Sequence, residues 1–159
     1  MLKRSLVFHI DTPQSGKTTT MLATEYYYRK RGHKPLIIKH LDENSNVDSN
    51  GFGNVPNEIV TGKHQALHVP NINQNYLDNF VFDMLLVDDV HKFSEEDVLK
   101  LKETSCARKI PVICYGLLKD ENNKYYPTSL KLMNTADYIY DLSGRDHRWH
   151  LPTDFTSER

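Results

Sequence analysis

The sequence has few of the features that mark secreted, membrane or fibrous proteins. Only two cysteines, Cys106 and Cys114, occur among the 159 residues, too few and too close together for a disulfide framework. No apolar run approaches the roughly 20 residues that a membrane-spanning helix needs. The residues after Met1 also form too short an apolar stretch for a signal peptide. We therefore expect a cytoplasmic protein with no membrane partner.

An excess of charge of one sign is also missing. The chain has 20 Lys and Arg against 21 Asp and Glu, for a net charge of −1. This balance does not favour a dedicated nucleic-acid-binding protein, which needs clustered cationic surface. Hydrophobic residues at 38% and charged residues at 26% are ordinary values for a globular chain. The length suits one domain, which we expect to span residues 1–143, followed by a polar tail over 144–159.

Short apolar runs rich in β-branched residues predict strands buried on both faces of a parallel sheet. These strands are expected at 6–10, 36–38, 84–87, 112–115 and 138–140. Helices are expected between them, at 18–31, 72–80, 95–106 and 128–135. Gly32 would end the first helix and Ser94 would cap the third. The alternation predicts a three-layer α/β fold: an open, mainly parallel sheet with helices on both faces and ligands at the carboxyl ends of its strands.

The clearest functional signal is the segment Asp-Thr-Pro-Gln-Ser-Gly-Lys-Thr at positions 11–18. It follows the first expected strand and opens the first helix, as a Walker A phosphate-binding loop does, although Asp11 replaces the motif's first glycine. Gly16 would let the backbone approach phosphate oxygens, Lys17 would neutralise phosphate charge, and Thr18 would ligate Mg²⁺. The residues assigned to nucleotide binding are Pro13, Gln14, Ser15, Gly16, Lys17, Thr18 and Thr19. The alternative is an ordinary strand–turn–helix with a solvent-exposed lysine.

Two acids follow the expected strand at 84–87. A carboxylate at a strand tip that holds Mg²⁺ is typical of a Walker B segment. Because adjacent strand residues point to opposite sides, we expect Asp88 to face the metal and Asp89 to face the second substrate as a general base. Strand-terminal acids can instead cap a following helix. The Asn-rich stretch 44–57 predicts a loop beside this site.

In their order along the chain, these segments resemble the thymidine kinase family (type II), which has a P-loop, RecA-like fold. The family's loop Gly-Pro-Met-Phe-Ser-Gly-Lys-Thr/Ser is similar to positions 11–18, and its Ile-Lys-Pro followed by an Asp is similar to 38–42. Its Ile-Asp-Glu-Ala-Gln-Phe-Phe is similar to positions 87–93. A further similar stretch spans 116–142, so the resemblance covers most of the chain.

The resemblance implies a Mg-ATP-dependent phosphotransferase with a deoxynucleoside-like acceptor. Lys17 and Asp89 would be its catalytic residues. Asp89 stands where the family has the Glu that accepts the proton of the 5′-hydroxyl, and Thr18 and Asp88 would hold Mg²⁺. Homo-oligomers are also implied, because family members form tetramers.

The resemblance also places Phe93 and Tyr126 around the acceptor base, and His91 stands where the family has Gln. Family members continue into a Cys-x-x-Cys zinc ribbon and a lasso loop that holds thymine. Residues 143–159 contain no cysteine, so we expect neither the ribbon nor a structural zinc.

A second interpretation stays open. The same core could serve as a nucleotide-binding module or an ATPase, linked to nucleic acid, that transfers phosphate to no nucleoside. Asp11 in the phosphate loop and the missing lasso motivate it.

Overall fold

The computed structural model describes residues 4–11, 17–55 and 64–141. Its strands are β1 (Ser5–Asp11), β2 (Pro35–His40), β3 (Phe52–Asn54), β4 (Gln65–Val69), β5 (Met84–Asp88), β6 (Pro111–Leu117) and β7 (Tyr138–Asp141). Its helices are α1 (Lys17–Lys30), α2 (Gln74–Leu77), α3 (Glu95–Arg108) and α4 (Pro127–Thr135), with a 3-10 turn η1 (Val90–Lys92). Among these residues, no helix is long and apolar enough to cross a membrane.

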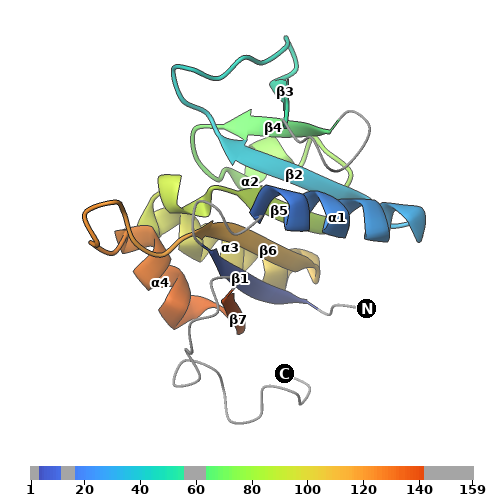
Figure 1. Ribbon diagram of the computed structural model, residues 1–159. Helices are drawn as coiled ribbons and strands as arrows, with labels where there is room; N and C mark the ends of the chain where they lie inside the picture. Colours follow the sequence, from blue (N-terminus) through green and yellow to red (C-terminus); the bar gives the residue numbers. More distant parts are fainter. Residues whose placement is uncertain (1–3, 12–16, 56–63, 142–159) are drawn as a thin grey trace.

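The strands form one open sheet in the order β3-β4-β2-β5-β6-β1-β7 (Figure 1). Neighbouring strands are parallel, except that β3 pairs with β4 in the antiparallel direction at one edge. The carboxyl ends of β1, β5, β6 and β2 therefore meet at one edge of the sheet. The expected open, mainly parallel sheet is confirmed.

Helices cover both faces of this sheet, as expected (Figure 1). On one face, Met21 and Leu22 of α1 are buried in a cluster with side chains from β1, β2, β4, β5 and β6. On the other face, Val98 and Leu101 of α3 and Leu132 of α4 are buried in a larger cluster. Alternate residues of one strand serve opposite clusters, since Val7 belongs to the first and neighbouring Phe8 to the second. This pattern explains why the strands read as continuous apolar runs.

The helix ends follow the local sequence. Ser94 caps α3: its hydroxyl accepts from the Asp97 N–H, and the Asp97 carboxylate accepts from the Ser94 N–H, both at 3.1 Å. Gly32 follows α1 with φ of +89°, the left-handed conformation that glycine adopts without steric cost. Both sequence predictions are confirmed.

The two strands at one end of the strand order, β3 and β4, differ from the sequence prediction. The expected loop 44–57 contains β3, and β4 was not predicted at all. Both strands escape the pattern because β3 is only three residues long, while β4 has polar side chains at two of its five positions. The helix expected at 72–80 is also shorter, since only Gln74–Leu77 is helical.

The middle of β1 carries a half-buried histidine, His9. The His9 ring stacks on Tyr115 and Tyr140, with ring centroids 4.7 Å and 5.0 Å away. Its Nδ1 is buried and has no hydrogen-bond partner among the described residues. Burial lowers the pKa of His9 from 6.5 to about 4, because desolvation disfavours the charged ring.

We expect His9 to make the protein sensitive to mild acid. His9 binds a proton near pH 6.5 in the unfolded chain, but only near pH 4 in the folded protein. The free energy of unfolding therefore receives the full contribution of neutral His9 above pH 6.5. As the pH falls to 4, about 3 kcal/mol of that free energy is lost. Urea unfolding at pH 7 and pH 4 measures this loss. In His9→Phe the loss should be smaller by about that amount, and equal losses in the two proteins would contradict the assignment.

Candidate active site

The phosphate-loop segment connects β1 to α1. β1 ends at Asp11 and α1 begins at Lys17, so the strand and helix expected on either side of the loop are confirmed. Residues 12–16, which include the proposed nucleotide-binding positions 13–16, lie outside the described residues, as do the side chains of Asp11 and of 17–19. Their roles remain predictions from sequence.

The sheet places this segment and the two acids at the same edge. β1 and β5 are parallel to β6, which lies between them. The end of β5 is therefore two strand spacings, or about 10 Å, from the end of β1. A ligand held at the start of α1 can extend across the end of β6 toward Asp88.

The two acids do not point to opposite sides of the sheet, contrary to the sequence prediction. The Lys39 ammonium lies between them, 3.1 Å from Asp88 Oδ2 and 2.6 Å from Asp89 Oδ2. The alternation rule fails because β5 ends at Asp88 and Asp89 has left-handed backbone angles, φ 51° and ψ 50°. Aspartate tolerates this conformation better than most side chains. The turn at Asp89 thus brings both carboxylates to one cation.

Burial distinguishes the two acids. The Asp88 side chain is 3% exposed and that of Asp89 is 17% exposed. Lys92 lies farther out, with its ammonium 3.9 Å from Asp89 and 3.8 Å from Asp42. The Asn44 N–H, donating to the Asp42 carboxylate, holds the pKa of Asp42 below its ordinary value. Asp88 is therefore the interior acid and Asp89 the acid that a substrate can reach.

The two aromatic residues assigned to the acceptor base differ in position. Phe93 is 3% exposed and belongs to the larger core cluster, with its ring nearly perpendicular to that of His40. Tyr126 is half-buried, and its ring centroid lies 4.6 Å from that of His91. In this conformation Phe93 is a core side chain, and Tyr126 is the more accessible of the two.

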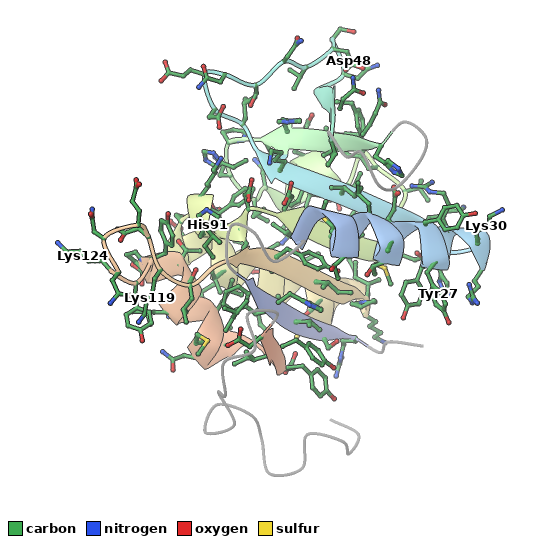
Figure 2. All side chains as sticks on the ribbon, viewed as in Figure 1. Tyr27, Lys30, Asp48, His91, Lys119 and Lys124 are labelled. Atoms are coloured by element: carbon green, nitrogen blue, oxygen red, sulfur yellow. The ribbon has the colours of Figure 1, made fainter. Side chains whose placement is uncertain are left out.

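His91 is held by the backbone of β6. Its Nδ1 accepts a hydrogen bond of 3.1 Å from the Leu117 N–H, so the neutral ring carries its proton on Nε2. A Cβ on Gly116 would lie 3.1 Å from His91 Nδ1 and 2.9 Å from Val90, which shows how closely η1 packs on β6. Figure 2 shows His91 on the side of the molecule that also carries Lys119 and Lys124, in the loop before α4.

Two features of the site had no signal in the sequence pattern. Lys39 stood out in the sequence only as part of the segment 38–42, which is similar to the family's Ile-Lys-Pro, because a lysine at the end of a strand is ordinarily exposed to solvent. A polar cavity of about 290 Å³ opens beside it, lined by Lys39, Asp42, Asn44, Ser45, Asn46, Asn54 and His68. Its walls come from β2, β3, β4 and the 42–46 segment, so it depends on the strand pairing that the sequence did not reveal.

The parallel sheet, the loop before α1 and the acids at the end of β5 define a P-loop α/β protein. A family model described as "Thymidine kinase" matches residues 4–144. The chain is 29% identical over 148 residues to a thymidine kinase of Francisella tularensis, covering 89% of this chain and 73% of that protein. It is 30% identical over 144 residues to a thymidine kinase of Blochmanniella pennsylvanica, covering 86% and 68%. The chain belongs to the thymidine kinase family.

Proposed function

We propose that this protein transfers the γ-phosphate of ATP to the 5′-hydroxyl of thymidine or a closely related deoxynucleoside. The observation that supports this most is the pair of acids at the end of β5, Asp88 buried and Asp89 accessible, at the sheet edge where the phosphate loop begins. The names of the curated relatives supply the class of acceptor.

Mg²⁺ fits the residues at this edge. Mg²⁺ is usually held by one or two carboxylates together with substrate phosphates, and not by ligands from the protein alone. Among the described residues, no cluster of three or more acidic, histidine or cysteine side chains could hold a metal ion, while Asp88 offers a buried carboxylate. Thr18 and Asp88 would hold the ion together with the nucleotide phosphates. When bound, Mg²⁺ neutralises phosphate charge.

The phosphate loop would position the nucleotide. Backbone N–H groups of 13–16 and the positive end of α1 would bind its phosphates, and Lys17 would neutralise charge on the β- and γ-phosphates. Thr19, in the first turn of α1, completes this set. Because these groups act mainly by position and charge, they would contribute most of the rate enhancement.

Asp89 would act on the acceptor. The acceptor's hydroxyl oxygen forms a bond to the γ-phosphorus, the bond from that phosphorus to the bridging oxygen breaks, and ADP leaves. The hydroxyl proton passes to the Asp89 carboxylate, which then releases it to water. Tyr126 would pack against the acceptor base, next to His91. Phe93 would support the site from the core.

Phosphoryl transfer from γ-labelled ATP tests this function directly. The protein is incubated with Mg²⁺ and each of the four deoxynucleosides in turn, and the products are separated. We expect labelled thymidine monophosphate to exceed the other products, and chelation of Mg²⁺ to abolish it. Label that stays in ATP, or appears only as free phosphate, would contradict the proposal and favour a nucleotide-binding module or an ATPase on the same fold.

A further inference from the structure

Lys39 is placed beside the two acids by the pairing of β2 with β5. In this parallel pair, Lys39 lies directly opposite Asp88, so both side chains leave the same face of the sheet. The Lys39 side chain is 27% exposed, and its ammonium bonds Asp88 at 3.1 Å and Asp89 at 2.6 Å. Lys39 thus connects the interior acid to the accessible one.

The bridge is ionic at neutral pH. A lysine side chain carries its proton at neutral pH, and two carboxylates contact this ammonium. Its contacts are partly screened from solvent, where charge-assisted hydrogen bonds are stronger than at a surface.

The two carboxylates lie close together, and the Lys39 ammonium offsets part of the repulsion between them. Both contact the same ammonium, so the contacting oxygens are separated by about 6 Å or less, a distance at which two like charges repel each other. Asp88 is more deeply buried than Asp89, so loss of Lys39 would change the position of Asp89 more. Its nearest other described cation is the half-exposed Lys92, 3.9 Å away, which would draw it outward.

We propose that Lys39 is a positioning residue, which holds the Asp89 carboxylate beside Asp88 in the orientation that receives the acceptor hydroxyl. This inference rests on the proposed function and deepens it. Lys39 acts through Asp89 and need not touch either substrate. A displacement of about 1 Å at a reacting group costs about 10²-fold in rate, so the effect of losing Lys39 should appear in kcat.

The test compares Lys39→Met, which keeps the length of the side chain and removes its charge, with the wild-type protein. We expect kcat for thymidine phosphorylation to fall about 10²-fold, while KM for ATP and for thymidine stays within about threefold. Lys39→Arg restores a cation at the same place and should recover at least about one tenth of the wild-type kcat.

Lys102→Met is the matched control. The Lys102 ammonium also makes two carboxylate contacts, both of 2.8 Å to Asp137, and its side chain is 33% exposed. Asp137 in turn accepts from the Leu6 N–H, at the amino end of β1 and so at the opposite edge of the sheet. This variant should lower the thermal midpoint and leave kcat unchanged.

The outcomes separate the hypotheses. A Lys39→Met protein with kcat within about threefold of wild type, or an equal fall in kcat for Lys102→Met, would overturn the positioning role. If Lys39→Met fails to fold, Lys39→Gln, which keeps two N–H donors, is measured against the same limits. A wild-type protein that transfers no phosphate would contradict the proposed function itself, whatever the variants do.

Discussion

Replacing Lys17 with alanine is expected to reduce phosphoryl transfer from ATP by at least about 10³-fold. Lys17 is the first residue of α1 and belongs to the segment 11–18 that is assigned to the phosphate loop. The substitution removes the positive charge that we propose neutralises the β- and γ-phosphates during transfer, and groups of this kind contribute several powers of ten. Initial rates with γ-labelled ATP and thymidine measure the effect.

Lys30→Ala provides a control on the same helix. Lys30 is the last residue of α1, exposed, with its ammonium 5.5 Å from the centre of the Tyr26 ring. Alanine suits a helix at either position, so both variants should fold and Lys30→Ala should keep wild-type activity. Turnover by Lys17→Ala within about tenfold of wild type would exclude a phosphate-binding role for Lys17.

Asp89→Asn is expected to lower kcat by about 10²- to 10⁴-fold, the range that general-base groups contribute. Asparagine adopts the left-handed backbone conformation as readily as aspartate, so the turn at φ 51° should persist. The amide cannot accept a proton from the acceptor hydroxyl. Binding of a fluorescent ATP analogue should stay within about threefold of wild type, because Asp89 is not assigned to nucleotide binding.

Asp89→Glu separates the need for a carboxylate from the need for its position. Glutamate restores the residue that the thymidine kinase family has here, with one more methylene. We expect this variant to be at least about tenfold more active than Asp89→Asn. If the two variants are equally impaired, a carboxylate on the side chain of residue 89 does not restore activity, which would contradict its role as a general base.

The strands that the sequence revealed are those that contain a continuous apolar run. β1 and β5 are apolar runs since each serves both cores, and the turns at Gly32 and Ser94 depend on single residues of known conformational preference. β4 was missed because His68 interrupts its apolar pattern and is buried through a contact with the Ala66 carbonyl, 3.1 Å from its Nδ1. Strand pairing decides such positions, and a single sequence does not display it.

The site shows the same division. Asp88 was assigned correctly to the end of a strand, because a strand end needs only local sequence. The common direction of Asp88 and Asp89 depends on one residue's backbone conformation, which the alternation rule does not anticipate. Lys39 depends on the register between β2 and β5, two segments about fifty positions apart in sequence. The sequence therefore identified the acids at the end of a strand, but not how their side chains and Lys39 are arranged.

The helix α1 is the only helix packed on its face of the sheet within the part of the chain that the structure describes. Its first turn carries residues that we propose bind the nucleotide, whereas Met21 and Leu22 are buried in one of the two cores. A nucleotide bound there would be released whenever the helix detaches, so binding favours the docked helix by mass action, by about 2.7 kcal/mol at a concentration 100 times Kd. ATP supply would then govern the lifetime of the protein against proteases as well as its rate of turnover.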